Sequence, residues 1–188
     1  NGWTWLTLPG STYGLTGYSH GNSGIALALL ELYYQSGEKS FWEASRMAFL
    51  YEKQWYQEDQ KNWPDLREYT PSKGKPSCNH AWCHGAPGIA LSRMRAYQLT
   101  KIEAFKQEAI DALTATVVNT QHQLKTGAGN YSLCHGIAGN TYVLYEAAVL
   151  FGNPEYRRIA DQVCMQGIQQ YGKWHLTWPS GINDPSGK

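Results

Sequence analysis

The pattern His-Gly-x-x-Gly occurs three times in this chain of 188 residues, and each copy stands directly before a long apolar segment. The copies begin at His20, His84 and His135. The apolar segments are apolar almost all round, which predicts helices that are buried on every side. A turn and an amphipathic segment with helical spacing follow each of them. The sequence therefore predicts an all-α array of about three helix hairpins, with buried helices inside and amphipathic helices outside.

Local signals predict where these helices begin and end. The inner helices are predicted at residues 25–34, 89–99 and 137–151. Ser40 is predicted to cap the first outer helix, with Glu52 on its solvent side. Asn153 is predicted to cap the last outer helix, with Pro154 in the first turn. Two stretches rich in proline and glycine, 57–80 and 172–188, are predicted to be loops, and no segment predicts a strand.

The overall charge excludes some classes of partner. The chain has 16 basic and 15 acidic residues, for a formal net charge of +1. This balance gives no reason to expect binding to nucleic acid or to an anionic membrane. No apolar run is long enough to span a bilayer. The 8 Trp and 13 Tyr residues cluster near the glycine-rich stretches, which suits a lined cavity as well as a core.

Two of the four cysteines directly precede a motif histidine. If the hairpins stand side by side, the three motifs meet at one end, where the N-termini of the inner helices favour thiolates. Cys83, Cys134 and His135 would then offer three ligands to Zn²⁺ and leave a fourth position open, as catalytic zinc sites do. The alternative is that these cysteines are simply small residues packed where helices begin.

The other two cysteines have no such context. Two disulfides are conceivable for a secreted domain, but the matching His-Gly contexts favour metal binding in a reducing, cytoplasmic compartment. Cys164 lies in a helical pattern and is predicted to be a buried thiol. Cys78 is interpreted as an exposed loop thiol or a spare ligand.

The three motifs together resemble those of a known family. They read Gly17-Tyr18-Ser19-His20-Gly21-x-x-Gly24, Trp82-Cys83-His84-Gly85-x-Pro87-Gly88 and Cys134-His135-Gly136-x-x-Gly139. They look like the motif set of the lanthionine synthetase C-like family, the cyclases that close thioether rings in lanthipeptides. The first two are most similar to those of the C-terminal cyclase domain of class II bifunctional synthetases. The resemblance implies an α/α toroid, of which residues 1–188 would form a single partial domain.

The resemblance also implies a zinc-dependent mechanism. Zinc would be bound by Cys83, Cys134 and His135, and would lower the pKa of a cysteine thiol of the peptide. The thiolate then adds to dehydroalanine or dehydrobutyrine and forms a lanthionine ring. His20 matches the family's candidate acid–base residue, although a histidine that only hydrogen-bonds nearby backbone would look the same.

Further expectations concern the surroundings of the site. The residues expected to line the metal site are His84, Tyr18, Trp82 and Asn79. Asn79 stands where some family members carry an arginine. The implied partners are a dehydrated precursor peptide and the rest of a larger synthetase polypeptide, including a dehydratase domain and the missing toroid repeats.

Two other functions fit parts of the sequence. A zinc- or thiol-binding protein of the same fold without ring-forming activity would carry the same ligands. An α/α-toroid glycosidase would show a similar aromatic-rich cavity, but it needs a pair of carboxylates, and none of the three motifs carries an acid.

Overall fold

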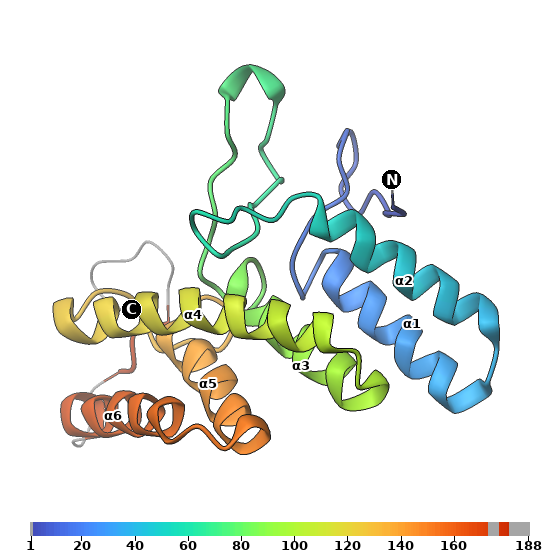
Figure 1. Cartoon of the computed structure of the whole chain (residues 1–188). Helices are drawn as coiled ribbons and strands as arrows, with labels where there is room; N and C mark the ends of the chain where they lie inside the picture. Colours follow the sequence, from blue (N-terminus) through green and yellow to red (C-terminus); the bar gives the residue numbers. More distant parts are fainter. Residues whose placement is uncertain (1, 173–176, 181–188) are drawn as a thin grey trace.

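Three helix hairpins stand side by side in the computed structural model, which describes residues 2–172 and 177–180 (Figure 1). The helices are α1 (Asn22–Ser36), α2 (Lys39–Lys53), α3 (Ala86–Thr100), α4 (Glu103–Thr126), α5 (Ile137–Phe151) and α6 (Pro154–Tyr171). Helix α3 packs between α1 and α5, whereas α4 packs against α3, α5 and α6. Apart from isolated bridges, the described residues form no strand. The all-α prediction is confirmed.

Short turns with one residue in the left-handed conformation end most of the helices; this residue is a glycine after α1, α4 and α5 and Lys101 after α3. Gly37 ends α1 in the left-handed conformation at φ 72°, and its N–H donates to the carbonyl of Tyr33. Asn153 caps α6 as predicted, because its side chain accepts from the Glu155 N–H at 2.9 Å. The prediction for Ser40 was wrong: α2 already begins at Lys39, so Ser40 lies in its first turn.

The inner helices start three residues earlier than predicted in the first two repeats. Helices α1 and α3 begin at Asn22 and Ala86, immediately after the first glycine of each motif. The x-x-Gly part of the motif therefore forms the first helical turn and is not a loop before it. This places the motif histidines two residues before the helix starts.

The core lies between the inner and outer layers. The larger cluster joins α3, α4, α5 and α6, and its fully buried side chains include Ile89, Leu113, Val143, Leu144 and Ile159. A smaller cluster joins α1 and α2 around Leu30, Ala48 and Phe49. Burial of these apolar side chains supplies the main driving force for the packing of the hairpins.

Glu52 corrects the predicted orientation of α2. It was expected on the solvent side, but it is fully buried and accepts from the buried Arg93 of α3 at 2.8 Å. Its other oxygen accepts from the Gly17 N–H at 2.8 Å, and its carboxylate also accepts from the Ser23 hydroxyl. Arg93 donates in addition to Glu108 of α4 at 2.7 Å. This ionic network joins all four helices of the first two hairpins to the first motif.

The inner helices are less completely buried than their composition predicted. Helix α5 exposes Tyr142, Tyr145 and Val149, which are 46%, 41% and 70% exposed. Helix α1 likewise exposes Leu32 and Tyr34. Neighbouring helices cover these side chains only in part, as where Arg157 of α6 lies over the Tyr145 ring. An inner helix needs neighbours on every side to be buried all round.

The long connection between α2 and α3 projects away from the helices (Figure 1) and contains the 3₁₀ helix η1, Pro71–Lys73. Its base is part of the core: Asn62 and Trp63 are fully buried. The Asn62 side-chain carbonyl accepts from the Ala86 N–H at 2.7 Å and so satisfies the start of α3. Most of the predicted C-terminal loop, 172–188, lies outside the described residues. Among the described helices, none is both long and apolar enough to cross a membrane.

Candidate metal centre

Backbone hydrogen bonds hold the three motif loops in register. The N–H groups of Tyr18 and Ser19 both donate to the carbonyl of Cys83 at 3.2 Å. The Cys83 N–H in turn donates to the carbonyl of Cys134 at 3.3 Å. Ser19, Cys83 and Cys134 occupy the same position in successive motifs, so the same bond recurs from repeat to repeat. Residues far apart in the sequence are thereby brought to one place.

The second glycine of each motif makes this stacking possible. A Cβ added at Gly88 or Gly139 would lie only 1.9 Å from the carbonyl oxygen of Trp82 or Leu133, six residues earlier. The same close approach recurs at Gly24. No other residue type fits there without movement of the backbone, which explains why the motif requires glycine at this position.

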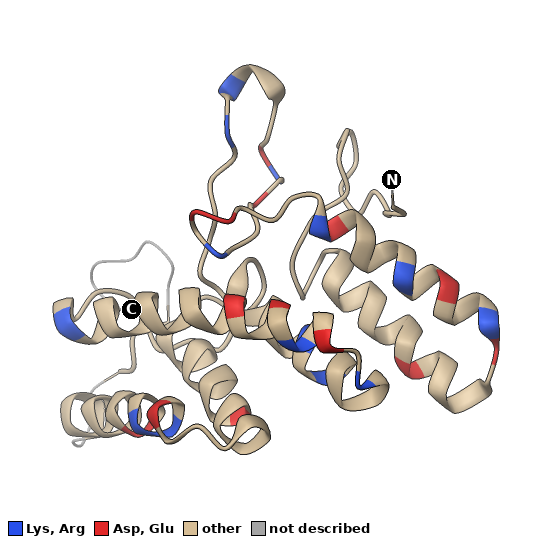
Figure 2. Ribbon diagram, viewed as in Figure 1, with Lys and Arg blue, Asp and Glu red and all other residues tan. Residues whose placement is uncertain are grey.

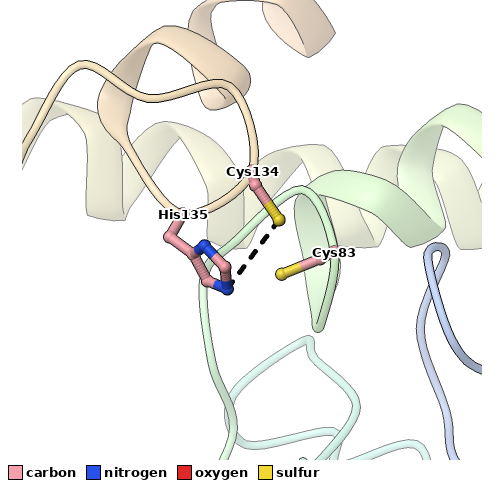
Figure 3. A group of neighbouring side chains, drawn as sticks. All are labelled: Cys83, Cys134 and His135. Atoms are coloured by element: carbon pink, nitrogen blue, oxygen red, sulfur yellow. Dashed lines mark hydrogen bonds between the residues drawn. The ribbon is translucent and has the colours of Figure 1, made fainter. Parts of the chain in front are cut away.

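The metal ligands predicted from the sequence lie together. Figure 3 shows the sulfur atoms of Cys83 and Cys134 beside the ring of His135. Their ligand atoms all lie within 4.8 Å of one another, and Cys134 Sγ is 3.8 Å from His135 Nε2. Ligands on a tetrahedral zinc, with bonds of about 2.0–2.3 Å, are about 3.3–3.8 Å apart, so small side-chain movements would close the site.

The chemistry of these donors also fits a metal dication. Cys83 is buried, and burial, followed by the neighbouring Cys134 thiol, raises the pKa of the Cys83 thiol above its ordinary value. Two thiolates this close would repel each other in a site of low dielectric constant. A bound divalent cation would reverse this, because it favours both thiolates. Two thiols and an imidazole are the soft ligand set that zinc prefers.

The two other motif histidines form a pair beside this centre. The rings of His20 and His84 are 5.6 Å apart between centroids. His20 is exposed, whereas His84 is only 2% exposed. Burial, followed by the charge of Arg67, lowers the pKa of His84, which favours its neutral form. The His20 ring is therefore accessible to solvent, whereas the neighbouring His84 ring is buried.

The aromatic residues expected to line the site lie together. Tyr18 and Trp82 pack edge to face with centroids 5.2 Å apart, and both line the hollow that contains His20. Each stands directly before the Ser or Cys of its motif. This aromatic pair therefore lies next to Cys83 in the stacked motif loops.

Asn79 is exposed and faces the long connection. Its side-chain amide donates to Asp65 at 2.8 Å, and Asp65 forms an ion pair with Arg67. The Arg67 charge lowers the pKa of Cys83, although burial has the larger and opposite effect. Sequence reasoning missed Asp65 and Arg67, because both lie in a connection without a motif and only folding brings them near Cys83.

The remaining cysteines lie outside the cluster. Cys78 is half-buried, and burial raises the pKa of its thiol to about 11. It does not belong to the group of metal-ligating side chains found among the described residues. The prediction for Cys164 was wrong: its side chain is exposed on α6, where it lines an open cavity between α5 and α6. All four cysteines are free thiols.

Comparison with known proteins agrees with the class that these features define, a protein of helical hairpins with a Cys/Cys/His group that could hold a metal ion. The family model of lanthionine synthetase C-like proteins matches residues 8–184. The chain belongs to this family. The motif resemblance and the fold lead to the same assignment.

Three known proteins with similar sequences have names that state an activity or a biosynthetic role. The chain is 27% identical over 138 residues to the lacticin 481/lactococcin biosynthesis protein LcnDR2 of Lactococcus lactis subsp. lactis, covering 69% of this chain and 14% of that protein. It is 27% identical over 132 residues to the nisin biosynthesis protein NisC of the same organism, covering 65% and 30%. It is 34% identical over 61 residues to glutathione S-transferase LANCL1 of Danio rerio, covering 32% and 14%.

A solved structure, nisin cyclase, shares the fold. The TM-score is 0.67 at 18% sequence identity, and the match covers 85% of this chain but 41% of that one. This similarity establishes the α/α toroid as the architecture to which the three hairpins belong. The chain spans less than half the length of this structure, and less than a third of LcnDR2 and NisC.

Proposed function

We propose that this chain forms the metal-binding half of a zinc-dependent lanthipeptide cyclase, which adds cysteine thiols of a peptide to dehydroalanine or dehydrobutyrine. The observation that carries the proposal is the convergence of Cys83, Cys134 and His135 from two consecutive motifs. Three protein ligands leave a fourth position for a substrate thiol. The names of LcnDR2 and NisC, both biosynthesis proteins of lanthipeptide type, support the same substrate class.

Zinc bound here would lower the pKa of the substrate thiol and hold its sulfur as a nucleophile. The protein residues then have two tasks. Cys83, Cys134 and His135 hold the ion, and their thiolate donors keep its electrophilicity moderate. His20, exposed beside this centre, accepts the proton of the thiol.

The reaction balances without any further reagent. The thiolate sulfur forms a bond to the β-carbon of the dehydro residue, and the electron pair of the C=C bond moves to the amide carbonyl as an enolate. Protonation of the α-carbon by the histidine that took the thiol proton completes the ring. The product has the same mass as the substrate and one free thiol fewer.

The metal ligands can be tested by replacement. Cys134→Ala is expected to remove zinc, measured by elemental mass spectrometry of the full-length protein, and to abolish the loss of alkylatable thiol in a dehydrated peptide. Cys164→Ala is the matched control, since that thiol is exposed on α6. Zinc that stays stoichiometric in Cys134→Ala would refute the assignment of the ligands.

A second variant separates catalysis from metal binding. His20→Asn is expected to keep its zinc and to slow ring closure by roughly 10²–10⁴-fold, the usual contribution of a general acid–base group. Full activity of His20→Asn would remove His20 from the mechanism while leaving the zinc site intact.

One relative favours a second candidate function. LANCL1 is named a glutathione S-transferase, and an open zinc position that binds a thiol would serve glutathione as well as a peptide cysteine. The two functions differ in the substrate: ring closure within one dehydrated peptide, or transfer of a small thiol to another electrophile. A glycosidase gains no support, because the site offers metal ligands and not a pair of carboxylates.

The partners and the compartment follow from the same proposal. Since the chain spans 14% of LcnDR2, we propose that it acts within a larger synthetase polypeptide, on a dehydrated precursor peptide. Free thiol ligands require reducing conditions, which fits the cytoplasm.

A further inference from the structure

The inner helices carry almost no charge, and the charges they have follow the repeat. Helices α1 and α5 each contain a single charged residue, Glu31 and Glu146, and α3 contains Arg93 and Arg95 (Figure 2). Arg93 is buried in the ionic network of the core. Glu31, Arg95 and Glu146 each stand eleven residues after the motif histidine of their own repeat. These three side chains therefore form one layer, at the same depth below the motifs.

This charged layer lines a groove. A cavity of about 340 Å³ lies between α1, α3 and α5 and is lined by Glu31, Arg95 and Glu146. Apolar side chains, among them Leu91 and Met94, form part of its wall. The pair Tyr18 and Trp82 also lines it, and Trp82 directly precedes the metal ligand Cys83. The motif end of the groove is therefore formed by the residue next to Cys83, and the charged layer lies deeper along the inner helices.

The groove carries one more negative than positive side chain, since Glu31 and Glu146 face the single cation Arg95. Glu31 and Arg95 form an ion pair, with Arg95 Nη2 3.2 Å from a Glu31 carboxylate oxygen. Glu146 is half-buried and makes no ion pair or hydrogen bond among the described residues. A carboxylate in a partly apolar wall is stabilised by a cation, because burial removes part of its hydration. The groove therefore offers one negative charge to a ligand.

We propose that this groove binds a lysine or arginine side chain of the peptide substrate, with its cation on Glu146. The proposal rests on the cyclase function proposed above. The aliphatic stem of such a side chain suits the apolar wall, and its charged end suits the carboxylate. Charge complementarity is what selects this ligand over an apolar or acidic one.

The distance of Glu146 from the motif end of α5 predicts how far the basic residue of the peptide lies from the reacting cysteine. Glu146 is nine residues into α5, so it lies about 14 Å along the helix from the motif end at 1.5 Å per residue. An extended peptide covers this distance with about four residues. The preferred substrate therefore carries its basic residue about four positions from the cysteine that reacts.

Peptides that differ only in this residue test the proposal. The full-length, zinc-loaded protein is given dehydrated peptides with one cysteine and with lysine, norleucine or glutamate four positions away, and kcat/KM of ring closure is measured by thiol alkylation. Lysine is expected to exceed norleucine by about tenfold, the effect of one half-buried ion pair. Glu146→Gln is expected to remove this preference, and Glu146→Lys to shift it to the glutamate peptide.

Controls separate this proposal from the cyclase function. Glu103→Gln, on the exposed start of α4, is the matched control and is expected to keep the lysine preference. Binding of the same labelled peptides is measured by fluorescence anisotropy, which needs no turnover. A lysine preference in binding without ring closure supports the groove and contradicts the cyclase. Equal affinity and equal turnover for lysine and norleucine peptides, or a lysine preference that survives Glu146→Gln, overturns the proposal for the groove.

Discussion

The three side chains of the candidate metal centre differ in their exposure to solvent. Cys83 is buried, whereas Cys134 and His135 are partly exposed, so one side of the cluster is open. The other two motif histidines differ in exposure: His84 is buried, whereas His20 is exposed. Neither belongs to the group of metal-ligating side chains found among the described residues. An open side is what a substrate thiol needs in order to reach a bound ion.

Cys78 allows a test of pH dependence that does not involve the metal. Burial raises the pKa of its thiol from 9.0 to about 11. Since the thiolate is the reactive form, alkylation of Cys78 is expected to keep accelerating up to about pH 11. Peptide mapping by mass spectrometry measures the rate, with the exposed Cys164 as the control for reagent access. A rate that levels off near pH 9 would contradict the effect of burial.

Sequence reasoning at this scale succeeded where a motif fixed the position of a residue. Cys83, Cys134 and His135 were grouped correctly in space because their repeats are adjacent. Glu52 and Cys164 were misplaced, the one expected outside and the other inside. Helical spacing gives the relative angle between residues, but a charged residue on an apolar edge is buried only if a partner such as Arg93 lies opposite.

Local turn and cap residues determine the bounds of the helices, and one buried ionic network determines how the first two hairpins pack. Glycine turns fix where α1, α4 and α5 end, and the Asn153 cap fixes where α6 begins. The motif glycines fix how closely the inner helices approach the preceding loop. The network of Glu52, Arg93 and Glu108 then fixes the first hairpin against the second. The Gly17 N–H joins this network, so it also positions the loop that carries His20.

Removal of Arg93 tests the importance of the network. Arg93→Ala leaves the fully buried Glu52 carboxylate without its cationic partner, and this is expected to lower the free energy of unfolding by about 3–5 kcal/mol in urea denaturation. Arg46→Ala, which breaks the exposed pair with Glu43, is the control and should leave the denaturation midpoint nearly unchanged. A similarly small effect of Arg93→Ala would show that the network contributes little to stability.

At the scale of the whole molecule, the candidate metal ligands come from separate hairpins. Cys83 precedes α3, whereas Cys134 and His135 precede α5, so an ion bound by all three would crosslink the second hairpin to the third. The hydrogen bonds from Tyr18 and Ser19 connect the first hairpin to the same place. Metal binding and the arrangement of the hairpins are therefore expected to stabilise each other.

Chelation tests this linkage. Removal of zinc with a chelator is expected to lower the thermal midpoint of the full-length protein by about 5–10 °C, because a ligand at a hundred times its Kd contributes about 2.7 kcal/mol. Differential scanning calorimetry measures the shift. The chelator should have no such effect on Cys134→Ala, and an unchanged midpoint of the unmodified protein would mean that the metal does not crosslink the hairpins.

The sequence by itself determined the repeat, the helical class and the residues able to bind a metal. These follow from local chemistry: apolar periodicity specifies a helix, glycine permits close backbone contact, and the side chains of cysteine and histidine are able to ligate zinc. The tertiary structure alone decided the buried pairing of Glu52 with Arg93, the approach of Arg67 to Cys83, and the groove lined by Glu31, Arg95 and Glu146. Each depends on which helix faces and loops meet, and that is settled by packing between segments far apart in the chain.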